Sequence, residues 1–230
     1  MRWTSFEVVM QLLRDRSSFL TEIENNKYLD QKIVSLLISS SLFLALYGAI
    51  VGSTSSGLQI LASAFKLPAL YLLTLIICLP TLYFMDVVLG SQKTFAQYVT
   101  LLLASVSMMS VMLFGFAPVT LFFRLSIDGY AFFLLLNIII LGFTGVVGIL
   151  FFYKSMIALI EKEQLGKAAA NRYKLIKSWL FLYGFVGSQL GWTLRPFVGS
   201  PNEPFALFRE IESNFYVQVV YIVARVLGLN

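Results

Sequence analysis

The sequence predicts an all-α membrane protein, a polytopic transmembrane helix bundle with about five spans. Of the 230 residues, 58% are hydrophobic and 13% are charged, whereas soluble domains have roughly half apolar and about a quarter charged residues. The apolar residues also form long uninterrupted blocks, instead of recurring at the helical or strand period of a soluble core. A bilayer is therefore the expected solvent, and a single domain is the simplest division of the chain.

Composition also argues against several kinds of chemistry. The sequence has no histidine, which is the commonest metal ligand and the usual general base near neutral pH. Its single cysteine, Cys78, can form neither an intramolecular disulfide nor a thiolate metal cage. The motifs HExxH and GxSxG are also missing. We therefore expect no catalytic residues, no metal site and no cofactor.

Residues 1–32 are predicted to form a cytoplasmic amphipathic segment. Phe6, Val9, Leu12 and Leu13 recur at roughly helical spacing, with charged residues between them. The segment lacks the uninterrupted apolar core of a signal peptide. Such a helix either lies in the membrane interface or packs on the inner surface of the protein itself.

The apolar runs predict the transmembrane bundle within residues 33–194. At 1.5 Å per residue, the first four runs are long enough to cross a hydrocarbon core of roughly 30 Å, and the last one is short. A Ser/Gly-rich outer loop is expected at Gly52–Phe65, with a short amphipathic piece at Leu58–Phe65. Pro68 is expected in the first turn of the next span. Residues 154–177 are expected to be a polar, solvated helical connector on the cytoplasmic side. The predicted spans are 33–51, 67–89, 98–123, 130–153 and 179–194.

Glycines at regular spacing mark faces of three spans where another helix could approach closely. Gly48 and Gly52 form one such pair in the first span. Two longer sets occur in the fourth and fifth spans. We expect helix packing at Gly142, Gly145, Gly148, Gly184, Gly187 and Gly191.

Three polar residues within the spans are predicted to make intramembrane contacts. Asp86, near the inner end of the second span, is expected to pair with a basic residue such as Lys93, with a coupled-ion role as the alternative. Asn137 is expected to form an interhelical hydrogen bond, with a substrate contact as the alternative. Gln189 lies among glycines and is expected to bond another helix.

Residues 195–230 are predicted to form an ordered cap on the outer face, because prolines end the last span and force successive turns. Phe197, Phe205, Phe208 and Phe215 are expected to pin the cap to the bundle. Residues 215–229 are expected to form an outer interfacial helix or a short, tilted sixth span. The expected surface for a partner or lipid comprises Trp192, Arg195, Pro196, Phe197 and Pro201.

Charge sets the expected orientation. Twelve of the 17 Lys and Arg residues fall on the side that contains the N-terminus, so the positive-inside rule predicts a cytoplasmic N-terminus. On the outer side, Arg195 could pair with Asp128 or Glu203 or bind a lipid phosphate. The expected location is a bacterial inner membrane or a thylakoid. Membrane lipids, other integral membrane subunits or further copies of the chain are the expected partners, and nucleic acid is not.

Two stretches carry a resemblance to known proteins. KLPALYLLTLIICLP, from Lys66 to Pro80, and GWTLRPFVGSP, from Gly191 to Pro201, resemble an uncharacterised family of bacterial and cyanobacterial polytopic membrane proteins. The stretch from Gly90 to Tyr98 is similar, more weakly, to the Yip-type membrane proteins of secretory traffic. The latter likeness implies a non-enzymatic adaptor or membrane-organising role, and neither supplies catalytic residues to carry over.

Three functions remain open from the sequence. A scaffold, assembly or accessory subunit of a membrane complex is the first, because of the glycine faces and the lack of catalytic constellations. A channel or small-solute transporter is the alternative, and a water-lined cavity containing Pro80, Asn137 and Gln189 would favour it. A lipid-modifying enzyme is third and would have to rely on Asp86, Asp128 or Arg195.

Overall fold

The structure is a computed structural model that describes residues 5–127, 129–162, 167–199, 205–208 and 215–226. Within these ranges all regular secondary structure is helical, and eight helices are present. The helices are α1 (Ser5–Arg14), α2 (Arg16–Glu24), α3 (Leu29–Gly52), α4 (Gly57–Val88), α5 (Phe95–Ser126), α6 (Tyr130–Lys162), α7 (Lys167–Thr193) and α8 (Phe215–Val226).

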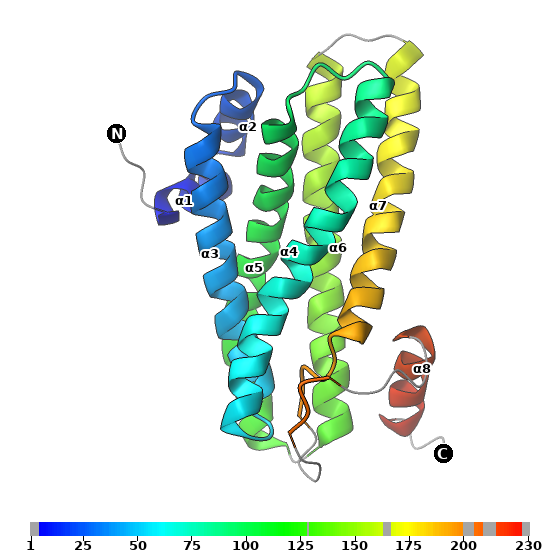
Figure 1. Cartoon of the computed structure of the whole chain (residues 1–230). Coiled ribbons are helices and arrows are strands. Elements are labelled where there is room, and N and C mark those ends of the chain that lie inside the picture. Colours follow the sequence, from blue (N-terminus) through cyan, green and yellow to red (C-terminus); the bar gives the residue numbers. More distant parts are fainter. Residues whose placement is uncertain (1–4, 128, 163–166, 200–204, 209–214, 227–230) are drawn as a thin grey trace.

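The five long helices, α3 to α7, run side by side as a bundle (Figure 1). The upper end in that view contains the turn between α4 and α5, and the lower end contains the turn at residues 53–56. Four of these helices, α3 to α6, are long and apolar enough to cross a membrane. The prediction of an all-helical membrane protein is therefore confirmed.

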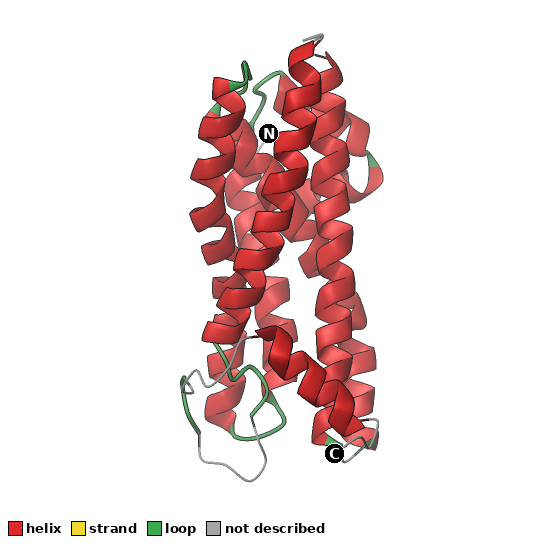
Figure 2. Ribbon diagram, turned by 90° about the vertical axis from the view of Figure 1, so that its right-hand side faces the viewer, coloured by secondary structure: helices red, strands yellow, loops and turns green. Residues whose placement is uncertain are grey.

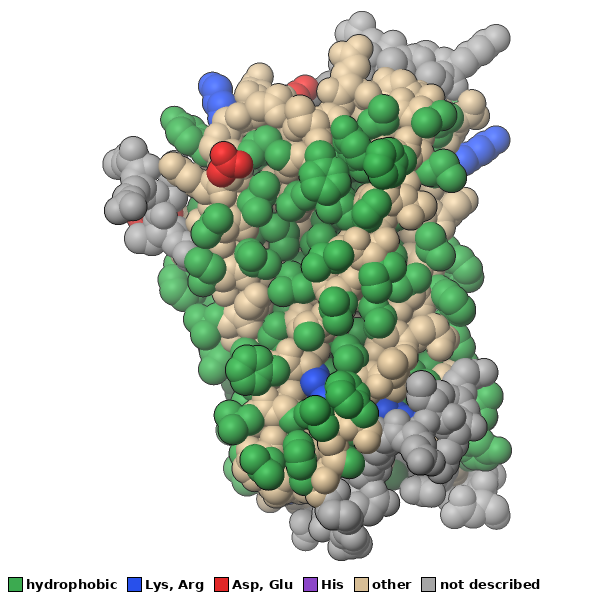
Figure 3. Space-filling model, viewed as in Figure 1, with side chains coloured by type: hydrophobic (Ala, Val, Ile, Leu, Met, Phe, Trp, Pro, Cys, Tyr) green, Lys and Arg blue, Asp and Glu red, His purple; other side chains and the backbone are tan. Residues whose placement is uncertain are grey.

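The outer surface of the bundle suits a hydrocarbon solvent. Phe84, Phe122 and Phe181 are 65%, 62% and 80% exposed. Figure 3 shows hydrophobic side chains over the middle of the molecule, with the charged side chains gathered toward the two ends. Single exposed apolar side chains are ordinary on soluble proteins, but large contiguous apolar surfaces mark contact with a membrane or a partner.

α4 begins earlier than the sequence predicted. Ser56 caps its first turn, accepting a hydrogen bond from the backbone N–H of Gln59 at 3.4 Å. Residues 58–65 therefore belong to the helix, and the expected loop at Gly52–Phe65 is reduced to residues 53–56. Pro68 and Pro80 both lie inside α4, so the expectation that Pro68 occupies a first turn is wrong.

The predicted polar connector at residues 154–177 is mostly the ends of two helices. α6 continues to Lys162 and α7 starts at Lys167. The last long helix therefore has 27 residues and not the length of a short span. A helix can continue past the hydrocarbon because its backbone hydrogen bonds are internal, and polar side chains are favourable at the headgroups.

The N-terminal helices pack on the bundle. Lys32 at the start of α3 is 3% exposed, forms an ion pair of 2.6 Å with Glu22 and lies 4.4 Å above the ring of Phe19. Val8, Val9 and Leu12 are buried, while Phe6, Met10 and Leu13 are exposed. α1 therefore has one apolar face on the protein and a second apolar stripe on the outside.

α3 and α4 approach each other closely at two glycines. A Cβ added to Gly48 would overlap the backbone of Ser63, and one added to Gly52 would come within 2.6 Å of the carbonyl oxygen of Gln59. The small-xxx-small spacing of this pair therefore serves helix packing, as the sequence predicted.

Opposite ends of the bundle should label from opposite sides of the membrane. The native cysteine, Cys78, is buried and should react little with a maleimide. Two single replacements place a cysteine at an exposed position, Gln92→Cys at the upper end and Ser55→Cys at the lower end. We expect an impermeant maleimide to label Ser55→Cys in intact cells and Gln92→Cys only after permeabilisation. The reverse pattern would contradict the cytoplasmic N-terminus, and labelling of both from outside would contradict the bundle as a membrane-crossing unit.

Candidate functional site

A cavity of about 840 Å³ occupies the lower half of the bundle. Its walls come from α3, α4, α6, α7 and α8, from Met109 of α5, and from residues 195–198 after the end of α7. The volume falls within the roughly 300–1,000 Å³ range of small-molecule and cofactor sites. Most of the side chains around it are apolar, with a few polar groups at identifiable places.

Glycines form two walls of this cavity. A Cβ added to Gly142, Gly145 or Gly184 would have no heavy atom of another residue within 4 Å. At Gly187 and Gly191 the nearest atoms, on Thr74 and Leu70, would lie 3.6 and 3.8 Å away. Gly142, Gly145 and Gly184 therefore do not make the close helix contacts that their spacing suggested, whereas Gly187 and Gly191 face α4 at ordinary van der Waals distance, and all five line the cavity.

Gly148 is the exception among the six glycines expected to pack. A Cβ there would overlap the side chain of Met109 from α5. Because a methionine side chain is long and flexible, this contact is looser than the contact of two backbones at Gly48. The boundary between packed and open helix faces thus falls between Gly145 and Gly148 on α6.

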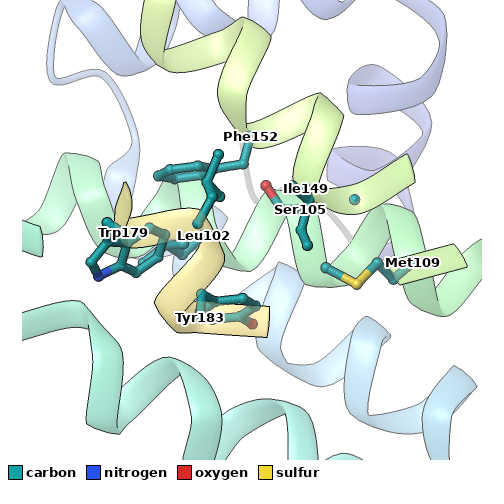
Figure 4. A pocket seen from close by; sticks show the side chains of 9 residues that line it. Leu102, Ser105, Met109, Ile149, Phe152, Trp179 and Tyr183 are labelled. Carbon is teal, nitrogen blue, oxygen red and sulfur yellow. The ribbon is translucent and has the colours of Figure 1, made fainter. Parts of the chain in front are cut away.

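An aromatic layer closes the cavity toward the upper end. Phe152, Trp179 and Tyr183 lie in a row, with ring centroids 5.5 Å and 5.3 Å apart. The Trp179 indole N–H donates to the carbonyl oxygen of Cys78 on α4 at 2.9 Å. Figure 4 shows these rings with Met109 around a pocket of only about 10 Å³. That space is about one probe sphere, so the layer is close-packed.

Polar side chains on the cavity wall are already hydrogen-bonded to one another. The Tyr47 hydroxyl donates to Asn137 Oδ1 at 3.0 Å and lies 3.2 Å from the Thr120 hydroxyl. Asn137 in turn donates to the carbonyl oxygen of Phe133 at 2.8 Å. This cluster joins α3, α5 and α6, which confirms the interhelical hydrogen bond expected of Asn137.

The segment after α7 is fixed to the lower end of the bundle by its backbone. The Gln59 amide donates to the carbonyl oxygen of Pro196 at 3.0 Å, and the Ser63 hydroxyl donates to that of Phe197 at 2.5 Å. The Lys66 ammonium donates to the carbonyl oxygens of Pro196, at 3.2 Å, and of Leu207. These three donors project from α4, and the sequence analysis did not identify any of them.

Two further hydrogen bonds complete the attachment of this segment. Thr54 donates to the carbonyl oxygen of Gly199 at 3.1 Å, and Tyr130 donates to that of Val198 at 3.4 Å. Phe197 packs against the buried core, and the ring of Phe208 lies 5.0 Å from the Lys66 ammonium, as expected of residues that pin the segment. Phe205 is 39% exposed and Phe208 57%, so these two rings remain partly open to the surroundings. Unpaired backbone carbonyls are costly near a membrane, which explains why polar side chains hold this segment.

Arg195 lies at the lower mouth of the cavity. It follows the last turn of α7 and is one of the lining residues. Its guanidinium carbon is 3.7 Å from the centroid of the Trp192 ring. A guanidinium at this distance is held by cation–π attraction to the indole. Of the residues expected to contact a partner or lipid, Trp192, Arg195, Pro196 and Phe197 all line the cavity, and Pro201 lies outside the described residues.

α8 forms the remaining wall. It crosses the lower part of the bundle obliquely (Figure 2), and its Tyr216 hydroxyl is 3.1 Å from the Ser188 hydroxyl of α7. With 12 residues it is about 18 Å long, too short to cross a membrane. The alternative of a sixth span at residues 215–229 is therefore not supported within the described part, which ends at Val226.

A buried ion pair joins α4 to α7 near the upper end. Both Asp86 and Arg172 are 0% exposed, and Arg172 Nε and its terminal nitrogen donate to the two carboxylate oxygens at 2.6 and 2.8 Å. The Tyr98 hydroxyl also donates to Asp86. Asp86 thus pairs with a basic residue, as expected, but the partner is Arg172 and not the example Lys93. Arg172 is buried although the sequence placed it in a solvated connector.

Gln189 is the remaining polar residue for which an intramembrane contact was expected. Gln189 is half-buried and is not among the cavity-lining residues. Asp128 and Glu203, the expected carboxylate partners of Arg195, lie outside the described residues. The functional geometry is therefore the lower cavity with Arg195 at its mouth. Comparisons with protein-family models, with curated proteins and with solved structures found no match to this chain, so the two resemblances drawn from the sequence stay predictions.

Proposed function

We propose that this protein is a non-enzymatic integral membrane protein that binds the apolar chain of a membrane lipid in its lower cavity. The observation that carries the proposal is the cavity itself, about 840 Å³ with mainly apolar walls between helices that present lipid-facing surfaces. The proposal includes α7 as a fifth membrane crossing and a cytoplasmic N-terminus.

Energetics favour an occupied cavity. Gly142 and Gly184 on its walls are exposed, so the cavity is open to the medium around the bundle. Apolar walls that touch an occupant keep the van der Waals contacts that walls around an empty space lose. Water would gain few hydrogen bonds from these walls. Lipid chains surround the bundle and match the walls in polarity, so they are the natural occupant.

The other functions expected from the sequence have less support from this geometry. The accessory-subunit reading relied on glycine faces that dock other helices, and five of those glycines line the cavity instead. A water-lined space containing Pro80, Asn137 and Gln189 would have favoured the transporter reading. Of these, only Asn137 lines the cavity, and the aromatic layer closes its upper side.

Filling the cavity should remove the bound lipid. Gly145→Phe and Gly184→Phe each place a ring where a Cβ meets no neighbour, so we expect the fold to tolerate them and the lipid retained per protein to fall several-fold. The measurement is quantitative mass spectrometry of lipids extracted from protein purified in a mild detergent.

The matched control is Gly115→Phe on α5. Gly115 is also a helical glycine with nothing within 4 Å of an added Cβ, but it does not line the cavity. Lipid retention by this variant should equal that of the wild type. Equal retention by all four proteins would overturn the proposed function.

A further inference from the structure

We propose that the exposed apolar stripe of α1, formed by Phe6, Met10 and Leu13, inserts among the acyl chains of the membrane leaflet at the upper end of the bundle. α1 is then an interfacial helix that touches the protein on one side and lipid on another. This inference depends on the bundle crossing a membrane, and it is independent of what occupies the lower cavity.

The side chains of α1 form three sectors, because successive residues of a helix turn by about 100°. One sector is buried against the protein and consists of Val8, Val9 and Leu12. The second is the apolar stripe, whose members are 52%, 46% and 42% exposed. The third is polar and consists of Glu7, Gln11 and Arg14. A surface helix of a soluble protein has an apolar face toward the core and polar residues elsewhere, so the exposed apolar sector needs another partner.

The polar sector of α1 lies level with the start of α3. The Gln11 amide donates to Glu22 at 3.0 Å, and its oxygen accepts from the Lys32 ammonium at 3.1 Å. Lys32 lies in the first turn of α3, directly before the apolar run that begins at Ile33. Charged side chains that flank an apolar run are favourable at the level of the lipid headgroups. The polar sector of α1 is therefore at the headgroup level.

The apolar stripe reaches further toward the middle of the bundle. The ring centroid of Phe6 lies 6.1 Å from that of Phe43 on α3, which in turn lies 5.0 Å from that of Phe114 on α5. Phe43 comes 11 residues after Lys32, which is about 16 Å further along the helix. Figure 1 shows α1 beside the upper part of α3. α1 thus lies at the boundary between headgroups and hydrocarbon, with its stripe on the hydrocarbon side.

The protein surface next to the stripe already faces lipid. Ile38 and Leu42 on α3 and Phe114 on α5 are 53%, 45% and 43% exposed, and both helices are long and apolar enough to cross a membrane. Through Phe6 and Phe43 the stripe continues this apolar surface without a break. Acyl chains that cover α3 and α5 therefore cover the stripe as well. Interfacial amphipathic helices bury their apolar face at this same headgroup and acyl boundary.

The test compares two adjacent positions of α1 that belong to different sectors. Leu13→Cys lies in the stripe and Arg14→Cys in the polar sector. Each variant carries a nitroxide spin label in phosphatidylcholine vesicles, and its collisions with two relaxing agents are measured. Molecular oxygen concentrates in hydrocarbon, whereas a nickel chelate stays in water. We expect the label at residue 13 to be several-fold more accessible to oxygen than to nickel, and the label at residue 14 to show the reverse.

Three reference measurements make the result quantitative. Ile38→Cys on α3 supplies the value for a lipid-facing site, and Gln92→Cys in the turn before α5 supplies the value for water. The unmodified protein, whose Cys78 is buried, gives the background signal. Met10→Cys is a second position in the stripe and should match Ile38→Cys if the label at residue 13 disturbs α1.

Two outcomes would overturn the assignment of the stripe to acyl chains. If the labels at residues 10 and 13 collide with nickel as often as the label at residue 92, the stripe faces water and α1 lies above the membrane. If both agents are excluded from these labels while oxygen still reaches the label at residue 38, protein covers the stripe, either a second copy of this chain or another subunit.

Discussion

Asp86→Asn is expected to destabilise the protein by about 3–5 kcal/mol, the usual cost of removing one partner of a buried ion pair. The Arg172 guanidinium has 0% exposure and uses two of its nitrogens on the Asp86 carboxylate. Without the carboxylate, a positive charge would stay buried between α4 and α7. Unfolding of the purified protein by SDS in mixed micelles would measure the loss.

The double variant Asp86→Asn with Arg172→Gln separates the pair from its surroundings. Removing both charges leaves no uncompensated ion, so the double variant should be less destabilised than the sum of the two single variants. Lys154→Met, which removes an exposed charge from α6, should change stability by no more than about 0.5 kcal/mol. Additive losses would show that the two charges do not stabilise each other.

Among the described glycines, Gly48→Ala is expected to be the most destabilising replacement by alanine, because its Cβ would come closest to a neighbouring backbone. The new Cβ would overlap the backbone of Ser63 on α4. A backbone cannot relieve such an overlap by changing rotamer, as a side chain can. Overpacking of this kind costs about 1–3 kcal/mol, and the rigid neighbour favours the upper part of that range. The same SDS titration gives the change in free energy of unfolding.

Gly142→Ala is the matched comparison for Gly48→Ala. Both glycines lie inside long helices, but a Cβ on Gly142 meets nothing within 4 Å. Since alanine favours a helix by up to about 1 kcal/mol over glycine, this variant should be as stable as the wild type or slightly more stable. A loss at Gly142 as large as that at Gly48 would contradict the open α6 wall.

The apolar runs predicted the helices correctly over the stretches that suit hydrocarbon, but they did not predict where the helices begin and end. Each of the four long runs lies within one helix, because only a helix satisfies its own backbone in lipid. The helix ends were missed, at Gly57 for α4 and at Lys167 for α7, since polar residues at the headgroups carry no hydropathy signal. Ser56 before Gly57 is a capping signal that could have corrected the first of these.

The site was partly predictable. Trp192 and Arg195 were identified because an Arg next to a Trp at the end of an apolar run is typical of a membrane interface. The role of the glycines could not be read from the sequence, because Gly48 and Gly142 both belong to regularly spaced sets, and the sequence does not show what lies opposite either of them. For Gly142 the answer depends on α7 and α8, which are distant in sequence. The Asp86 and Arg172 pair is likewise 86 residues apart.

The attachment of the segment after α7 has a consequence for how this protein can vary. The bundle binds the segment through the backbone carbonyl oxygens of residues 196–199 and 207. Every amino acid supplies such a carbonyl group. The side chains that fix the position of the segment therefore belong to another part of the chain, namely Gln59, Ser63 and Lys66 on α4. This segment can therefore change many of its own side chains while α4 keeps it in the same position.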